Sequence, residues 1–180
     1  MNSEETFNFV ATTYRNLENE LKHELEILLS EFLPISYLDV GITGIVAGKL
    51  YGDPLQASKI LWNITYHDPW RVKRTLRFIP IKYSCTSTIE NMGIVADKLL
   101  SDIPLGSTYK IEAELRRTKL TWGEVINAVA QRMIGLKAKM RDPDYLIQVQ
   151  ILGDICGMSA LRTGEVFRAL QAKLAGSEFP

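Results

Sequence analysis

The sequence of 180 residues contains no uninterrupted apolar stretch of roughly 18 residues, so it has no candidate for a transmembrane helix. Its start, Met-Asn-Ser-Glu-Glu-Thr, is acidic and polar, whereas a secretory signal peptide needs a basic start and an apolar core. The two cysteines, Cys85 and Cys156, are far apart in the sequence and form no C-x-x-C pair, so we expect two reduced thiols. These absences lead us to expect a cytoplasmic protein with no membrane partner.

Signatures of catalysis are equally scarce. Gly44, Gly48 and Lys49 superficially resemble a phosphate-binding loop, but only three residues separate the glycines and Leu50 follows the lysine. A Walker loop has four residues between its glycines and a Ser or Thr after its lysine. No G-x-G-x-x-G follows a predicted strand, the two histidines lack a second ligand at metal-binding spacing, and Ser159 lacks the glycines of a nucleophile elbow. We therefore expect no catalytic residue, no metal and no cofactor.

The formal net charge is zero, yet the charges are unevenly distributed. Residues 1–70 hold 4 Lys+Arg against 10 Asp+Glu, whereas residues 71–180 hold 17 against 11. Two basic stretches, residues 69–89 and 125–141, contain no acidic residue. Such asymmetry indicates a polyanionic partner. The alternative is that these cations form solvated faces with acidic neighbours in space.

The first part of the sequence predicts a strand, a helix, two strands, a helix and a strand. Asp53-Pro54 is typical of a helix start, with Asp as the N-cap and Pro at the first helical position. The predicted strands are residues 7–12, 35–40, 42–51 and 74–83, and the predicted helices are residues 14–32 and the segment that follows Asp53. This βαββαβ order is the ferredoxin-like arrangement. The small polar residues 83–88 indicate a domain boundary, so we assign residues 1–84 to the first domain.

Residues 85–180 predict a second domain. Tyr109, Ile111, Ala113 and Leu115 alternate with polar residues and predict a strand. Two segments have the spacing of a capping box, Thr121 with Glu124 and Ser87 with Glu90, and each predicts a helix start. The first of these helices would carry an apolar stripe from Val125 to Ile134. Residues 145–151 and 155–161 predict a hairpin across Gly153-Asp154, and residues 163–174 predict a last helix.

A basic pair after the strand, the capped helix, Asp142-Pro-Asp144, a second strand and Gly157-Met-Ser159 follow one another in this order. This pattern resembles the THUMP domain of thiouridine synthases, RNA methyltransferases and pseudouridine synthases. In that family a ferredoxin-like domain commonly precedes the THUMP domain, so the resemblance extends over nearly the whole chain. The expected fold class is α+β, with an N-terminal ferredoxin-like (βαββαβ) domain, residues 1–84, followed by an α/β THUMP domain, residues 85–180.

Two further segments, residues 8–13 and 68–81, resemble the stand-alone THUMP proteins that assist cytidine acetylation of tRNA. The resemblance implies a non-catalytic adaptor that binds tRNA and presents it to a separate acetyltransferase, which forms N4-acetylcytidine. Enzymes of the wider family grip the acceptor stem and 3′-CCA end with the same two domains. A-form RNA is recognised chiefly through its shape, backbone and unpaired ends, so we expect specificity for tRNA architecture.

Arginine and lysine are the expected RNA contacts because they neutralise phosphates and release counterions. The resemblance places the first contacts at Arg116, Arg117 and Lys119. Contact at Lys139 rests on charge alone, since many family members have an acidic residue at that position. Trp70 could stack on a base or pack between domains, and Trp122 is expected in a core or a domain contact. The complete set of predicted RNA contacts is Arg116, Arg117, Lys119, Lys137, Lys139, Arg141, Arg71, Lys73, Arg74, Arg77 and Arg162.

Three other functions compete with the adaptor. The chain could be the RNA-binding N-terminal portion of a larger tRNA-modifying enzyme, such as a thiouridine synthetase or a methyltransferase. It could instead be a ferredoxin-like regulator that binds a small ligand, which predicts a concave apolar pocket and no tRNA binding. An acetyltransferase in its own right is not expected, because no acyl-carrier loop is recognisable.

Overall fold

The computed structural model describes residues 6–177, which divide into two compact units. Residues 6–80 and 165–177 form the N-terminal unit, and residues Ile81–Gly164 form the C-terminal unit. The sequence had placed one boundary between residues 84 and 85, with everything after it in the second domain. The chain instead passes out of the N-terminal unit at residue 80 and returns to it at residue 165.

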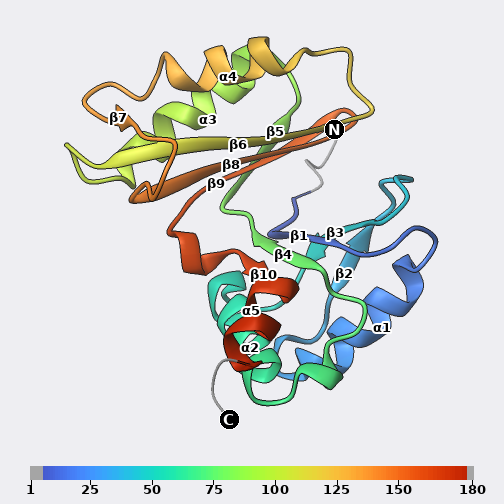
Figure 1. Ribbon diagram of the computed structural model, residues 1–180. Helices are drawn as coiled ribbons and strands as arrows, with labels where there is room; N and C mark the ends of the chain where they lie inside the picture. Colours follow the sequence, from blue (N-terminus) through green and yellow to red (C-terminus); the bar gives the residue numbers. More distant parts are fainter. Residues whose placement is uncertain (1–5, 178–180) are drawn as a thin grey trace. The chain divides into compact units, whose positions relative to one another are not determined.

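The N-terminal unit contains one antiparallel sheet with the strand order β10-β4-β1-β3-β2. Its elements are β1 (Phe9–Thr12), α1 (Glu18–Leu28), the 3-10 helix η1 (Ser30–Phe32), β2 (Ser36–Leu38), β3 (Ile45–Lys49), α2 (Pro54–His67), the 3-10 helix η2 (Pro69–Arg71), β4 (Arg77–Pro80), β10 (Phe167–Arg168) and α5 (Ala169–Ser177). The first six strands and α-helices follow the order βαββαβ (Figure 1). The predicted ferredoxin-like sheet is therefore confirmed, and β10 extends it by one strand.

Local sequence explains the limits of the first two helices. The side chain of Asp53 accepts the Leu55 N–H (2.9 Å), as the N-cap prediction requires, and Pro54 occupies the first helical position. The predicted helix over residues 14–32 is shorter in the structure, where α1 spans Glu18–Leu28. Asn16 has a left-handed backbone (φ 62°) and so cannot belong to a right-handed helix. The helix therefore begins only after this residue.

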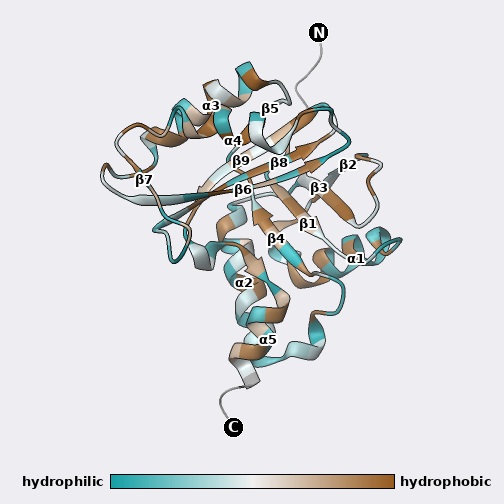
Figure 2. Ribbon diagram, turned by 45° about the horizontal axis from the view of Figure 1, so that its top comes forward, coloured by the Kyte–Doolittle hydropathy of each residue, from teal (hydrophilic) through white to brown (hydrophobic). Residues whose placement is uncertain are grey.

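Large apolar side chains from the strands and from α1 and α2 fill the core of the N-terminal unit. The rings of Phe9 and Phe78 stack at 5.1 Å between centroids, and Leu21, Leu25 and Leu61 pack in the same cluster. The strands β1 and β3 carry mostly hydrophobic residues (Figure 2). Burial of each such side chain contributes about 1.5–3 kcal/mol, so this core is a main source of the unit's stability.

The C-terminal unit has a mixed sheet with the strand order β5-β9-β8-β6-β7. Its elements are β5 (Tyr83–Thr86), α3 (Ile89–Ser101), β6 (Thr108–Arg116), α4 (Trp122–Ala130), β7 (Lys137–Ala138), β8 (Tyr145–Leu152) and β9 (Ile155–Leu161), followed by the 3-10 helix η3 (Thr163–Glu165). Strand β6 runs parallel to β7 and β8, whereas β9 is antiparallel to β8 and β5. Helices α3 and α4 cover one face of this sheet (Figure 1).

Several local predictions for this unit hold. Thr121 and Glu124 form the predicted capping box of α4, with the threonine hydroxyl accepting the Glu124 N–H and the carboxylate accepting the Thr121 N–H (2.7 Å). Tyr109 and the alternate residues after it in β6 pack into the core beneath the helices. The hairpin of β8 and β9 turns at Gly153, whose φ of 66° favours glycine. The capping box, the alternating strand pattern and the glycine turn thus predicted the central part of this unit correctly.

Other local predictions for this unit were wrong. Residues 83–86 form strand β5, which pairs with β9, whereas we had expected a domain boundary there. The N-cap of α3 is Thr88, whose side chain accepts the Asn91 N–H (3.2 Å), so the predicted Ser87 cap is displaced by one residue. Helix α4 ends at Ala130, and the Ile134 side chain is 74% exposed instead of completing the apolar stripe.

The predicted helix over residues 163–174 also differs from the structure. It is divided into η3, the short strand β10 and the start of α5. Strand β10 pairs with β4, and the Phe167 ring packs edge-to-face against Trp62 at 5.6 Å. The Ser58 hydroxyl donates to the Glu165 carbonyl (2.8 Å). These contacts attach the segment to the N-terminal unit, which a helical periodicity alone does not reveal.

Candidate nucleic-acid interface

Three predicted RNA contacts, Arg116, Arg117 and Lys119, lie together where β6 ends, and we call them the strand-end cluster. Arg116 donates to the Gln150 side chain (2.9 Å) and pairs with Glu114 (3.5 Å), and its side chain is only 17% exposed. Arg117 and Lys119 are exposed. The structure therefore presents Arg117 and Lys119 to a ligand, whereas Arg116 is engaged within the sheet.

Arg116 belongs to a chain of hydrogen bonds on the sheet face opposite the helices. Gln150 donates to the Gln148 side chain (3.3 Å), and Gln148 donates to the Glu112 carboxylate (2.6 Å). Both glutamines are fully buried, and buried amides are costly when they lack partners. Arg116 thus has a structural role beside the predicted contact with RNA, which stays a prediction.

A second group of cations, Lys137, Lys139, Arg141 and Arg162, lies where β6 and β8 begin, and we call it the strand-start cluster. The guanidinium of Arg162 lies 5.5 Å from the centre of the Tyr145 ring. The Asp144 carboxylate accepts the Thr108 N–H (2.7 Å) and hydroxyl (2.9 Å). These bonds lower the pKa of Asp144, and the nearby charges of Lys139 and Arg162 lower it further. The Asp144 carboxylate is therefore near both cations.

The two clusters lie at opposite ends of the same strands. Strands β6 and β8 are parallel, with Tyr109 opposite Tyr145 at one end and Arg116 opposite Leu152 at the other. At about 3.3 Å per residue, the ends of this paired stretch are roughly 25 Å apart. The predicted contacts of the C-terminal unit therefore form two separate sites and not one continuous patch.

The N-terminal unit carries a third group, Arg71, Lys73 and Arg74, which we call the loop cluster, beside the exposed Trp70 (82%). The Glu24 carboxylate on α1 holds this loop. It accepts the N–H groups of Lys73 (2.7 Å), Arg74 (3.0 Å) and Thr75 (2.7 Å) as well as the Thr75 hydroxyl (2.7 Å). The basic loop is therefore fixed by an acidic helix.

An apolar groove of about 770 Å³ lies between α1 and this loop. Ile27 and Leu28 line it together with Trp70, and all three members of the loop cluster are at its border. An exposed indole beside cations matches the chemistry of single-stranded nucleic acid binding, in which bases stack and phosphates are neutralised. The remaining predicted contact, Arg77, is half-buried in β4 and does not line this groove.

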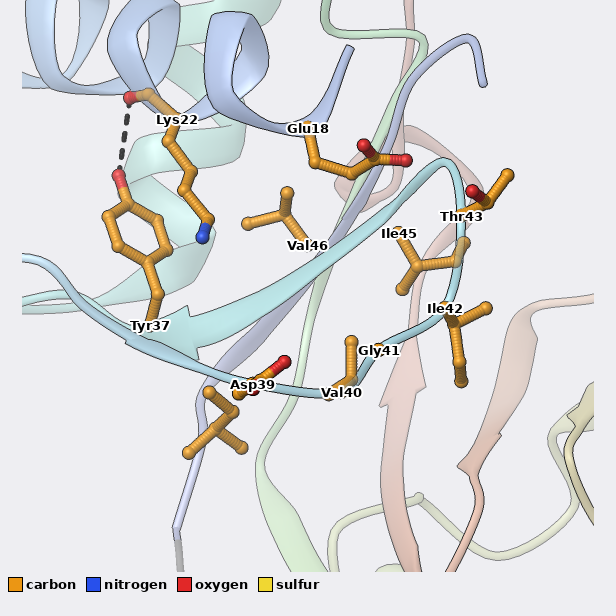
Figure 3. Close-up of a pocket in the computed structure, with 11 residues that line it drawn as sticks. Glu18, Lys22, Tyr37, Asp39, Val40, Gly41, Ile42, Thr43, Ile45 and Val46 are labelled. Atoms are coloured by element: carbon orange, nitrogen blue, oxygen red, sulfur yellow. Dashed lines mark hydrogen bonds between the residues drawn. The ribbon is translucent and has the colours of Figure 1, made fainter. Parts of the chain in front are cut away.

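A smaller hollow of about 330 Å³ lies between α1 and the β2–β3 connection (Figure 3). The Tyr37 hydroxyl donates to the Lys22 carbonyl (3.2 Å), and the Lys22 ammonium lies 5.1 Å from the Tyr37 ring centre. Burial and the neighbouring Glu26 raise the pKa of Tyr37. The Glu18 carboxylate accepts the Gly44 N–H, which lowers the pKa of Glu18. None of the predicted contacts lines this hollow.

Sequence reasoning missed two residues that organise these sites. Tyr145 supports Arg162 across the β8–β9 pair, and Glu24 holds a loop that is 49 residues away in the sequence. Trp122, which was expected in a core or a domain contact, is 59% exposed, so it does not lie in a core. In the described range, 6–177, no group of three His, Cys, Asp or Glu side chains could hold a metal ion. No helix in that range is long and apolar enough to span a membrane.

The family comparison decides what the C-terminal unit is. The model of the THUMP domain matches residues 88–161, from the N-cap of α3 to the end of β9. Residues 88–161 form a THUMP domain. THUMP domains are RNA-binding modules of tRNA-modifying enzymes. No curated protein matches the sequence significantly.

Solved structures share the fold of the THUMP domain and of the unit before it. Protein PH1313 from Pyrococcus horikoshii matches with a TM-score of 0.65 and 12% identity, covering 91% of this chain and 55% of its own. TrmN from Thermus thermophilus matches with a TM-score of 0.59 and 15% identity, covering 86% and 45%. A 4-thiouridine synthetase solved with RNA and ATP matches with a TM-score of 0.54 and 9% identity, covering 91% and 42%. The chain spans about half the length of these proteins.

Proposed function

We propose that this protein binds tRNA and presents it to a separate modifying enzyme, the cytidine N4-acetyltransferase, without catalysing the reaction itself. The observation that carries the proposal is the THUMP domain with exposed cations at both ends of its parallel strands. The resemblance of residues 8–13 and 68–81 to the stand-alone adaptors supports the choice of acetylation. The 4-thiouridine synthetase of the same fold was solved with RNA, which supports RNA as the ligand.

The charges of the described surface are suited to an RNA backbone. Within residues 6–177, no carboxylate lies within ion-pair distance of Lys137, Lys139 or Arg141. Such cations gain affinity by releasing the counterions that phosphates otherwise hold. Because the two clusters of the THUMP domain are roughly 25 Å apart, they would contact separate stretches of backbone and thereby respond to the shape of a folded RNA.

A reconstituted acetylation reaction tests the adaptor function. Purified acetyltransferase is incubated with tRNA, acetyl donor and ATP, with or without this protein, and N4-acetylcytidine is measured by mass spectrometry of the nucleosides. We expect acetylation to rise at least tenfold when the protein is added. Equal acetylation with and without it, at concentrations where tRNA is bound, would rule out the adaptor function and leave RNA binding intact.

The second candidate function is the RNA-binding portion of a larger tRNA-modifying enzyme. The lengths of the matched structures favour it, because this chain covers only 55%, 45% and 42% of them. The mass of the protein isolated from its native cells distinguishes the two functions. A chain of 20.4 kDa supports the adaptor, whereas a longer polypeptide that contains this sequence supports the larger enzyme.

A further inference from the structure

The two cysteines lie directly opposite each other in the sheet of the C-terminal unit. Cys85 in β5 is the register partner of Cys156 in β9, although 71 positions separate them in the sequence. Opposite residues of an antiparallel pair share one face of the sheet, with Cα atoms about 4.5–5.5 Å apart. A disulfide joins Cα atoms that are roughly 4.4–6.8 Å apart. The backbone therefore already has the spacing of a cross-strand disulfide.

The two thiols differ in access to solvent. Cys156 is fully buried in the core beneath α3 and α4, whereas Cys85 is half-buried in the outermost strand. A hydrogen bond with the Cys85 thiol, together with burial, raises the pKa of Cys156, which keeps Cys156 protonated while Cys85 is reduced. An oxidant from solution therefore reaches Cys85 first, and Cys156 is positioned to resolve the product.

We propose that Cys85 and Cys156 are a reversible oxidation site that forms an intramolecular disulfide when it meets a small disulfide such as oxidised glutathione. The Cys85 thiolate attacks one sulfur of oxidised glutathione, forms a mixed disulfide and releases one glutathione thiolate. Cys156 then attacks the sulfur of Cys85, and its proton passes to the departing second glutathione. The protein dithiol is oxidised, and one oxidised glutathione is reduced to two glutathione molecules.

The cross-link would stabilise the THUMP sheet. Strand β5 is at the edge of the sheet, next to β9, and its ends are held by the Ser87 N–H to the Asp154 carbonyl (2.8 Å) and the Lys82 N–H to the Met158 carbonyl (3.2 Å). A disulfide in the middle of this pair closes a loop of roughly 70 residues and restricts the unfolded chain. It therefore raises the temperature at which the C-terminal unit unfolds.

Incubation of the native full chain with an excess of oxidised glutathione tests the proposal. After quenching, unreacted thiols are alkylated under denaturing conditions and the intact mass is measured. We expect the wild type to lose two hydrogens and both alkylation sites, and its Tm to rise by roughly 5 °C or more. Reduced glutathione should reverse both changes.

Two variants distinguish the intramolecular disulfide from simple attachment of glutathione to an accessible thiol. Cys156→Ala keeps the accessible thiol and should stop at the mixed disulfide, with one glutathione attached to Cys85. Cys85→Ser should acquire neither glutathione nor a cross-link, because Cys156 is buried. The proposal is overturned if the native wild type keeps two alkylatable thiols, or if it retains glutathione on Cys85 without forming the disulfide.

Discussion

Arg117 combines an exposed cation with a backbone that disfavours its own side chain. Its φ of 52° lies in the left-handed region, where a residue with a Cβ is less stable than glycine by about 1–2 kcal/mol. Such strain persists where the surroundings or a function maintain it. Replacing Arg117 with glycine therefore removes the charge and also relieves the backbone strain, so the fold should be kept.

We predict that Arg117→Gly weakens tRNA binding while leaving stability unchanged or raised by about 1 kcal/mol. Loss of one phosphate contact should lower the slope of log affinity against log salt by about 0.7–0.9. Titration of labelled tRNA at several salt concentrations measures the slope, and thermal unfolding measures the stability. Arg117→Lys is the matched control, since it keeps the charge. Equal slopes for the glycine variant and the wild type would remove Arg117 from the interface.

For Trp70 we predict a loss of affinity without a change in salt dependence, because base stacking does not depend on charge. Base stacking on an aromatic side chain contributes about 1–3 kcal/mol, so Trp70→Ala should reduce affinity for a single-stranded 3′ end by roughly 5- to 150-fold. The salt slope should stay the same. Tyr51→Ala is the control, because Tyr51 is 74% exposed in the same unit but does not line the groove. Unchanged affinity for Trp70→Ala would exclude stacking and leave the groove open to a small ligand.

At the scale of elements, helix α1 determines the shape of the basic loop. The Glu24 carboxylate accepts hydrogen bonds from three successive backbone N–H groups, at Lys73, Arg74 and Thr75. Hydrogen bonds to a charged group contribute about 1.5–3 kcal/mol, so Glu24→Ala should destabilise the N-terminal unit by about 2–3 kcal/mol. Urea unfolding checks this value against Glu20→Ala, which removes a carboxylate from the same helix. If the two variants unfold at the same urea concentration, the loop is held by other contacts.

The start of β6 is joined to the turn before β8 through Thr108 and Asp144. Hydrogen bonds from Thr108 lower the pKa of Asp144 below its ordinary value of 3.8. A carboxyl group with a lowered folded pKa stabilises the fold above its unfolded pKa and loses that effect as pH falls through the folded pKa. We predict that the Tm difference between wild type and Asp144→Asn is largest above pH 4 and shrinks below it. A difference that grows as pH falls would contradict this assignment.

The elements differ in how far the sequence predicted them. The cap at Thr121 and the alternation after Tyr109 are encoded within a few neighbouring residues, so periodicity and capping rules identified them. Strand β5, the two-residue strand β7 and the return of residues 165–177 to the first unit depend on partners that are distant in the sequence. No local pattern specifies those partners, and these predictions were absent or wrong.

The candidate site also combines features that the local sequence predicts with features that depend on distant residues. Charge counts identified the basic residues, but the strand register determines that Arg162 joins Lys139 while Arg117 lies at the other end of the sheet. Composition could not show that Arg116 is engaged with Gln150 and Glu114. The sequence therefore identified the candidate cations, but it did not reveal how the fold arranges them.

For the whole molecule, we propose that the strand-start cluster binds an RNA backbone. The decisive variant replaces all four of its cations with glutamine: Lys137, Lys139, Arg141 and Arg162. The control variant replaces Lys98 and Arg132, two cations elsewhere in the C-terminal unit, of which Arg132 is paired with Asp97. Both variants should remain folded, because all six of the replaced residues are exposed.

The most direct test is the salt dependence of tRNA affinity for the wild type, the four-cation variant and the control. The account predicts that the four-cation variant loses at least tenfold in affinity at physiological salt and that its log–log slope falls by roughly 3. The control should match the wild type. A folded four-cation variant with the affinity and salt slope of the wild type would contradict the account.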